Sequence, residues 1–529
     1  MSQDLKEGER PPAILEPRCL LRGEITYSAA KEEDSNILHE LRYRDEKIRF
    51  FTHISRNRKL IRRIIGRHLG LPSDACHLVS VEDWIDGSFN VCIRADIDEQ
   101  GSLSKKQVMV RFPLPYRIGE SPHPGNSDEK IRCEAGTYAW LEENCPDVPI
   151  PRLYGFGLST WQNFTRLDNV PLITRAIHYL RRRLLGWLGY PAPSSYVSSQ
   201  IDESRSLGSG YILIEYIDSS RGKMLSDTWD TGRHDQKLRT NLFRGLSRIM
   251  ISLTRIPLPR IGSFILDDSG YLRLSNRPLT LQIQLLENEH IPVDIPRHIT
   301  HSTADSYIHD ILNFHENRFR YQPNAISSLQ DGVYQACALT VIRSVWPCFF
   351  RHDLLRGPFF LQLTDLHQSN IFVDEDWNIK CLIDLEWAST RPVEMLHPPH
   401  WLSGQPITEI DVEAYEILHK EFLAVLKEEE QNKPALGHSS LQLHSILQEG
   451  WERGTFWCSL ALNTPMALFE IFYNHIQPRF AENHKDEESF WLITMRYWTF
   501  GTFKFLEDKL KDKEQYDRHL HEAFTSPDA

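Results

Sequence analysis

The sequence predicts an α+β protein with two parts, a small antiparallel sheet near the N-terminus and a larger, mostly helical remainder. Two observations carry this prediction. Short runs rich in β-branched residues, separated by turn signals, occupy residues 76–114. From residue 217 onward the apolar residues recur at helical spacing, except in one strand-rich stretch at 359–388.

The composition is that of a globular protein with several folding units. The chain has 529 residues, of which 41% are hydrophobic and 25% are charged. A net charge of −12 argues against nucleic acid as a partner, because phosphate contacts need a basic surface. Nine widely spaced cysteines favour reduced thiols. With no signal-peptide core and no apolar run of membrane-spanning length, we expect a cytoplasmic protein.

Residues 1–75 are expected to form an N-terminal extension, and 33–69 within it has helical periodicity. From Lys47 to Arg67 this stretch carries eight cations and no acidic residue. We interpret it as a packed helix with a solvated basic face, and contact with a membrane or nucleic acid is the alternative.

Residues 76–217 are expected to hold five antiparallel strands and one helix. The strands are HLVSVEDWI, NVCIRADID, KQVMVRFPL, RLYGFG and GYILIEYI. Asn126, with Glu129 three residues later, marks the start of the helix, which should end near Asn144.

An insert at about 160–208 separates the last two of these strands. It contains a basic amphipathic segment, 175–188, and then a serine-rich stretch that is expected to be a mobile loop. We expect the apolar residues of the segment to pack on the body of the protein, and peripheral membrane contact is the alternative. These residues are Leu184, Leu185, Trp187 and Leu188.

Residues 218–525 are expected to form a helical domain, with helices near 234–254, 303–318, 327–346, 411–430, 455–475 and 485–512. One unusual stretch lies within it, FFLQLTDLHQSNIFVDEDWNIKCLIDLEWA. Asp365 and Asn370 form a D-x-x-x-x-N motif, and Asp384 ends the second strand of the hairpin that follows. A hairpin holds Asn370 and Asp384 at neighbouring strand ends, where two hard oxygen ligands can bind Mg²⁺. Asp365 lies just upstream and can accept a hydrogen bond from an attacking hydroxyl. These three residue types suffice for phosphoryl transfer, which needs mainly alignment and charge neutralisation.

The N-terminal half offers residues for the phosphates of a nucleotide. The turn with Gly87 and Ser88 can bring backbone amides to phosphate oxygens, and an ordinary hairpin turn is the alternative. Arg111 on the third strand is the candidate cation for the α- and β-phosphates. Glu134, 23 residues further on, can hold that cation, since a buried carboxylate needs a partner. A purely structural ion pair is the alternative there.

The base of the nucleotide is expected at the end of the last N-terminal strand. Backbone groups of Glu215 and Ile217 can pair with adenine, and an ordinary buried strand is the alternative.

Together these residues resemble the aminoglycoside phosphotransferase and choline kinase family, which shares the protein-kinase-like fold. The resemblance covers roughly residues 76–400 and is closest to fungal members, through RCEAGTYAWLEENCPDVPIPRLYGFG and LTDLHQSNIFVDEDW. It implies a two-lobed kinase-like fold, ATP and Mg²⁺ as cofactors, and transfer of phosphate to a hydroxyl of a small molecule.

By motif, Asp365 matches the family's catalytic aspartate, and Asn370 and Asp384 match its metal ligands. Glu134 matches the helix glutamate. Arg111 stands where the family usually has lysine, which keeps the charge but changes the shape of the cation.

A second departure leaves another function open. Leu363-Thr364 replaces the family's His-Gly before the catalytic aspartate. The alternative is therefore a catalytically impaired, kinase-like protein that binds or scaffolds partners. A protein kinase fits less well, since 231 residues separate Glu134 from Asp365 and no recognisable activation segment follows Asp384. The sequence identifies neither the acceptor nor any protein partner.

Overall fold

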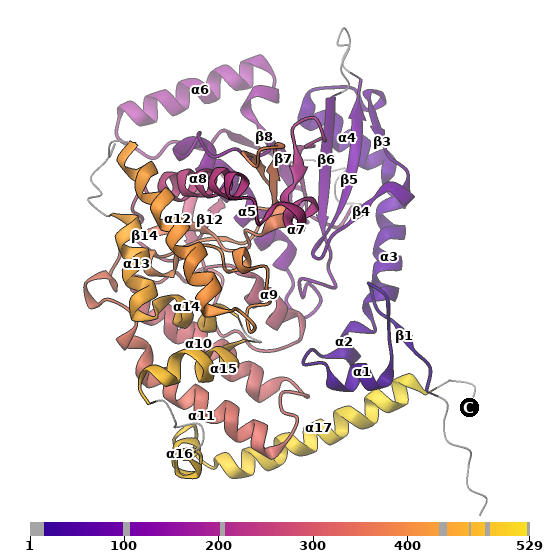
Figure 1. The fold of residues 1–529 in the computed structure, drawn as a ribbon. Coiled ribbons are helices and arrows are strands. Elements are labelled where there is room, and N and C mark those ends of the chain that lie inside the picture. Colours follow the sequence, from indigo (N-terminus) through magenta and orange to yellow (C-terminus); the bar gives the residue numbers. More distant parts are fainter. Residues whose placement is uncertain are drawn as a thin grey trace, which may run out of the picture.

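The computed structural model describes residues 15–98, 106–200, 207–432, 442–464, 467–481 and 487–525. Figure 1 shows a sheet-rich N-terminal region beside a larger helical region. The predicted α+β class, with an antiparallel N-terminal sheet and a helical C-terminal region, is confirmed.

One antiparallel sheet of eight strands forms the N-terminal region, in the order β3-β5-β6-β10-β7-β8-β9, with β4 paired to β5. The strands are β3 (Cys76–Leu78), β4 (Ile85–Asp86), β5 (Asn90–Ile97), β6 (Lys106–Pro113), β7 (Leu153–Gly157), β8 (Gln162–Arg166), β9 (Tyr196–Gln200) and β10 (Tyr211–Glu215).

The prediction of a five-stranded sheet is therefore wrong in number, although each predicted strand is present. The first breaks into β3 and β4 around a 3-10 turn at Val81–Asp83. Two more strands, β8 and β9, come from the insert. Two segments of the insert therefore extend the sheet. Polar residues dominate QNFTR and YVSSQ, which is why their strands escaped prediction. Residues 201–206 of the expected mobile loop lie outside the described residues.

The basic N-terminal stretch is not one helix but three, α2 (Ile37–Glu40), α3 (Tyr43–Arg56) and α4 (Arg58–Leu69). The apolar side of α4 packs on the sheet core. Some of its cations also point inward, since Arg62 donates to the Cys76 carbonyl at 2.7 Å and Arg58 to the Leu78 carbonyl at 2.9 Å. The basic face is thus partly used to hold β3.

The two ends of the chain meet away from the sheet. β1 (Arg18–Cys19), β2 (Glu24–Ile25) and α1 (Tyr27–Glu32) precede α2, and α17 (Thr502–Phe524) runs beside them (Figure 1). Their apolar side chains form a separate small core.

The long helix of the N-terminal region, α5 (Asn126–Asn144), has the predicted bounds. It packs on the hairpin β12 (Ser263–Leu266) and β13 (Leu272–Asn276) of the helical region. At Gly136 a Cβ would lie 2.4 Å from the Phe264 carbonyl oxygen, so only glycine permits this approach. This close contact fixes α5 between the two regions.

Most helices of the C-terminal region lie where apolar periodicity predicts them. They are α8 (Gln236–Leu253), α10 (Ala304–Tyr321), α11 (Leu329–Val345), α12 (Val412–Asn432), α14 (Thr455–Asn463), α15 (Leu468–Ile471), α16 (Glu488–Thr494) and α17. Three helices were not predicted, namely α7 (Trp229–Gly232), α9 (Leu281–Asn288) and α13 (Leu443–Arg453).

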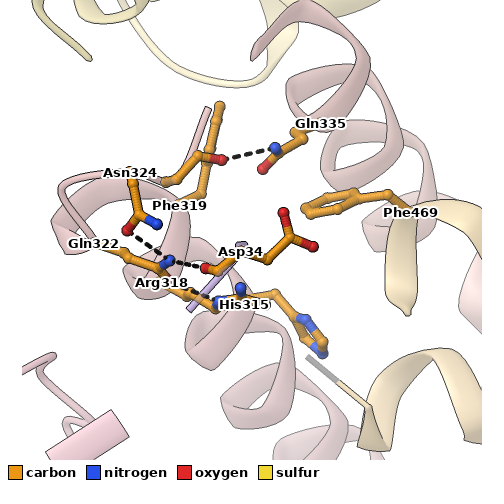
Figure 2. Close-up of a pocket in the computed structure, with 9 residues that line it drawn as sticks. Asp34, His315, Arg318, Phe319, Gln322, Asn324, Gln335 and Phe469 are labelled. Carbon is orange, nitrogen blue, oxygen red and sulfur yellow. Dashed lines mark hydrogen bonds between the residues drawn. The ribbon is translucent and has the colours of Figure 1, made fainter. Parts of the chain in front are cut away.

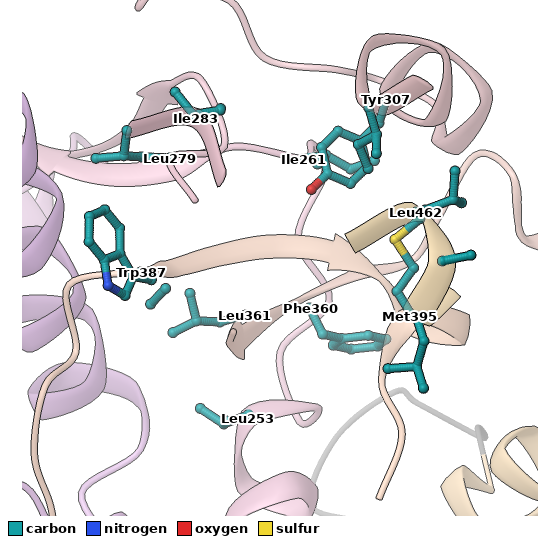
Figure 3. Packing of buried hydrophobic residues seen from close by; sticks show 14 of the residues in the cluster. Leu253, Ile261, Leu279, Ile283, Tyr307, Phe360, Leu361, Trp387, Met395 and Leu462 are labelled. Atoms are coloured by element: carbon teal, nitrogen blue, oxygen red, sulfur yellow. The ribbon is translucent and has the colours of Figure 1, made fainter. Parts of the chain in front are cut away.

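The strand-rich stretch forms two ladders inside this helical region. β14 (Phe359–Leu363) pairs with β17 (Ala388–Pro392), and β15 (Ile371–Val373) pairs with β16 (Ile379–Leu382) and β11 (Lys223–Met224). Pairing of Leu363 with Ala388 closes the segment between them into one loop. Figure 3 shows the core that supports this ladder, with Leu361 and Trp387 near Leu253 of α8.

The insert also carries α6 (Leu172–Trp187), which lies along the outer edge of the molecule (Figure 1). The prediction that its apolar residues pack on the body is wrong for Leu184, Trp187 and Leu188, which are 51%, 82% and 50% exposed. Only Leu185 is half-buried. In the described part of the chain, no helix is long and apolar enough to cross a membrane.

Candidate functional site

Asn370 and Asp384 lie at adjacent ends of β15 and β16. The Ile383 N–H donates to the Asn370 carbonyl at 2.9 Å, which ties Asn370 to the residue before Asp384. The Asn370 side-chain Nδ2 donates to the Asp365 carbonyl at 2.9 Å, and its amide oxygen takes no part in this bond. The structure thus brings together the three residues of the sequence motif.

Asp384 has a backbone conformation that is uncommon for a residue other than glycine. Its φ of 62° lies in the left-handed region, which non-glycine residues seldom adopt. Strain of this kind concentrates at functional sites, where the surrounding structure holds it in place. Here the hairpin on one side and an ion pair on the other hold Asp384.

Arg111 on β6 forms that ion pair and thereby joins the sheet to the hairpin. Its Nη1 donates to Glu134 Oε1 at 2.9 Å, and its Nη2 donates to Asp384 Oδ1 at 2.6 Å. The same Nη2 lies 3.1 Å from Glu386 Oε2. The predicted Arg111–Glu134 pair is present, and the other two carboxylates are partners that sequence reasoning missed.

Lys130 and Glu386 complete this cluster, and each side chain is 1% exposed. Lys130 forms an ion pair with Glu386 and donates to Asn90 Oδ1 at 2.8 Å, while Asn90 Nδ2 donates to Glu386 at 2.8 Å. A signal for both residues exists in the sequence. Lys130 precedes Glu134 by four positions on one helix face, and Glu386 follows Asp384 by two positions in an extended segment.

The charges of the cluster do not balance. Arg111 and Lys130 face Glu134, Asp384 and Glu386, so the cluster carries one excess negative charge when all are ionised. Asp365 adds a further carboxylate beside it.

This environment separates the pKa values of two neighbouring carboxyls. Burial raises the pKa of Asp365 to about 7, and the negative charges of Asp384 and Glu386 contribute. For Asp384, burial acts in the same direction, but the charges of Arg111 and Lys130 hold its pKa below the ordinary value. Asp384 therefore stays ionised, while Asp365 exchanges its proton near neutral pH.

Two hydrogen bonds fix the loop around Asp365. Thr364 Oγ1 donates to the Trp387 carbonyl at 2.5 Å, and Trp401 Nε1 donates to the Leu366 carbonyl at 2.8 Å. Both neighbours of Asp365 are thereby held. His367 lies further away, with its Nε2 4.0 Å from Asp365 Oδ2.

The predicted phosphate loop, with Gly87 and Ser88, connects β4 to β5. The Gly87 N–H donates to the Asn90 carbonyl at 2.9 Å, so this amide is engaged within the turn, and the prediction that the turn meets a phosphate stays a prediction. The Ser88 carbonyl accepts from Arg117 Nε at 3.0 Å. The turn meets the charged cluster through Asn90.

At the predicted adenine position, Glu215 and Ile217 differ. The Glu215 N–H donates to the Arg152 carbonyl at 2.8 Å and is therefore not available to a base. Ile217 belongs to a small apolar cluster with Phe372 of β15 and Cys381 of β16. The strand end thus packs against buried apolar residues of the hairpin that carries Asn370 and Asp384.

A cavity of about 140 Å³ lies behind the Asp365 loop. Leu363, Thr364, Leu366, His400 and Trp401 are among the residues that line it. Burial lowers the pKa of His400, so this side chain is neutral near pH 7. Arg391 also lines the cavity, which is mostly apolar.

Figure 2 shows a separate polar cavity of about 50 Å³, lined by Asp34, His315, Arg318 and Gln335 among others. These residues come from the N-terminal extension, α10 and α11, and none belongs to the charged cluster. The cavity has room for a few water molecules and is far too small for a nucleotide.

Within the described ranges, no group of three or more His, Cys, Asp and Glu side chains is arranged to hold a metal ion. The Asp365 motif is of a different kind, because one of its oxygen donors is the amide of Asn370.

No protein-family model matches the chain, and no curated protein matches it. Among solved structures, a Plasmodium vivax ethanolamine kinase is 12% identical over 82% of this chain and 84% of its own, with a TM-score of 0.36. A macrolide 2'-phosphotransferase type I is 12% identical over 80% of this chain and 90% of its own, with a TM-score of 0.32.

Proposed function

We propose that this protein is an ATP- and Mg²⁺-dependent phosphotransferase that moves the γ-phosphate of ATP to a hydroxyl of a small molecule. One observation carries the proposal. Asp365, Asn370 and Asp384 meet at the end of one hairpin, and Arg111 links Asp384 to Glu134 at 2.6 and 2.9 Å. A cation, two oxygen donors suited to a metal ion and a base thus occur together.

Asp365 acts as the group that orients and deprotonates the acceptor hydroxyl. A pKa of about 7 suits this role, because such a carboxylate accepts a proton near neutral pH and releases it again. Its contacts with Asn370 keep it beside the metal-type donors.

The donor set fits Mg²⁺. The Asn370 amide oxygen and the ionised Asp384 carboxylate are hard oxygen ligands of the kind this ion prefers, and the excess negative charge of the cluster favours a divalent cation. When bound, Mg²⁺ neutralises charge on the β- and γ-phosphates. Arg111 and Lys130 add positive charge on the side of the sheet.

The base of the nucleotide is proposed to lie against Ile217 and Phe372. This apolar cluster adjoins the strand end at β10, and the backbone of Ile217 offers the polar groups for pairing. A cytoplasmic location, where ATP is available, is part of the proposal and agrees with nine free cysteines.

A kinase-like binding protein without activity is the second candidate. The Arg111–Asp384 ion pair favours it, since this contact at 2.6 Å occupies one oxygen of a proposed metal ligand. Under that reading, the cluster is structural, and the altered Leu363-Thr364 sequence reflects lost catalysis.

Incubation with γ-labelled ATP, Mg²⁺ and pooled small-molecule alcohols tests the proposal. Wild type should transfer label to at least one pool. Asp365→Asn should lower the rate by at least ~100-fold, in line with removal of a general base. Asp376→Asn is the matched control, because Asp376 lies in the turn of the same hairpin and its side chain is 58% exposed. Equal rates for wild type and Asp365→Asn would contradict the assigned role.

A further inference from the structure

Helix α6 presents a continuous apolar stripe to solvent. Ile173, Ile177, Leu180, Leu184 and Trp187 recur at three- and four-residue spacing and are 77%, 64%, 68%, 51% and 82% exposed. A stripe with this spacing ordinarily faces a protein core. Here it is exposed to solvent, and α6 itself lies along the outer edge of the molecule (Figure 1).

The opposite side of α6 is tied to the body. His178 Nε2 lies 2.9 Å from the Ser194 carbonyl oxygen. Arg182 donates to Ser195 Oγ at 2.7 Å and to Glu143 Oε1 at 2.9 Å. These contacts set the rotation of the helix about its axis, so the outward direction of the stripe is built into the fold.

Positive charge borders the stripe. At 100° per residue, Arg181 and Arg183 fall on opposite sides of it. Arg181 donates to the Tyr271 hydroxyl at 3.1 Å, which holds its guanidinium beside the stripe. Between Pro171 and Tyr190 the sequence contains no aspartate or glutamate, although the whole chain has a net charge of −12. The local charge is thus opposite to that of the protein.

We propose that α6 binds the surface of an anionic lipid bilayer. The helix would lie in the plane of the interface, with the stripe at the boundary between headgroups and acyl chains and the arginines at lipid phosphates. The exposed surface is the convex ridge of a single helix, which a bilayer receives without a preformed groove. Trp187 and Tyr190, 82% and 64% exposed, are of the residue types that favour this interface. The inference is independent of the proposed catalysis.

Co-sedimentation of the full chain with vesicles tests this inference. One set of vesicles is phosphatidylcholine alone, and the other also contains phosphatidylserine. Wild type should bind the second set, and high salt should weaken that binding. Leu180→Glu/Leu184→Glu should lower the affinity by about tenfold or more, because it removes two apolar side chains that would be buried in the bilayer. Arg181→Glu/Arg183→Glu should do the same through charge.

Ile417→Glu is the matched control, since Ile417 lies on α12 and is 68% exposed, as Leu180 is. It should bind as wild type does. All substituted side chains are at the surface, so unchanged circular dichroism is expected throughout. Absence of binding to anionic vesicles, or equal binding by the Leu180→Glu/Leu184→Glu variant, would overturn the inference. Self-association that this variant abolishes, without vesicle binding, would overturn it too and assign the stripe to a second copy of the chain.

Discussion

Replacing Asp365 by asparagine should stabilise the protein above neutral pH while abolishing its activity. In the folded state, burial and the charges of Asp384 and Glu386 raise the pKa of Asp365 from 3.8 to about 7. The folded protein therefore binds this proton more tightly than the unfolded chain does. Stability contributed by the protonated carboxyl is present at low pH and is lost as pH rises through about 4 to 7.

The magnitude follows from that pKa. A change from 3.8 to about 7 corresponds to about 4 kcal/mol against the charged form by linkage. Because the side chain is 28% exposed, solvent screening reduces this cost, and we expect Asp365→Asn to gain about 2 kcal/mol at pH 8. At pH 4 the side chain at position 365 is neutral in both folded proteins, and their difference in stability should be close to zero.

Thermal unfolding of wild type and variant at pH 8 and pH 4 measures this effect. The variant should melt about 2–4 °C higher at pH 8 and within a degree or so of wild type at pH 4. Asp376→Asn, at a solvent-exposed position of the same hairpin, should show no such pH dependence. If Asp365→Asn destabilises the protein at pH 8, or changes the melting temperature equally at both pH values, the reasoning that the buried Asp365 carboxylate costs stability is refuted.

Three further outcomes are expected. Lys130→Met should destabilise the fold by about 3 kcal/mol, because it leaves Glu386 buried without its lysine partner. In urea unfolding, Lys130→Met/Glu386→Gln should regain much of the lost stability. Arg111→Lys should lower both the melting temperature and the phosphotransfer rate, since lysine cannot span the contacts of the guanidinium fork; an unchanged rate would show that only the charge matters. Gly136→Ala should cost about 2 kcal/mol or more, because its Cβ would lie 2.4 Å from the Phe264 carbonyl oxygen, and urea unfolding with no loss of stability would mean that α5 can shift.

The sequence predicted the fold best where a single local pattern decides the structure. The bounds of α5 follow from a turn and a helix start at Asn126, and β5 and β6 from short runs that contain valine and isoleucine between turn signals. β8 and β9 are polar, and only pairing makes them strands, β8 with β7 and β9 with β8. The predicted domain boundaries at residues 75 and 217 stay predictions.

The candidate site also has one part that local sequence predicts and one part that it does not. Asp365, Asn370 and Asp384 are close in sequence, so hairpin geometry alone predicts that they meet. Contacts of Glu386 with Arg111 and with Asn90 join positions 275 and 296 residues apart, and only tertiary packing creates them. The outward rotation of α6 is likewise set by tertiary contacts, which periodicity cannot reveal.

Calorimetric titration of ATP with Mg²⁺ into wild type and Asp384→Asn tests the central claim most directly. Wild type should bind ATP only when Mg²⁺ is present, Asp376→Asn should behave as wild type, and Asp384→Asn should lose the Mg²⁺-dependent part. At 100 times the dissociation constant, binding should also stabilise wild type by about 2.7 kcal/mol, which a parallel melting experiment detects. No binding by the folded wild type, or equal binding by Asp384→Asn, would contradict the proposed nucleotide site.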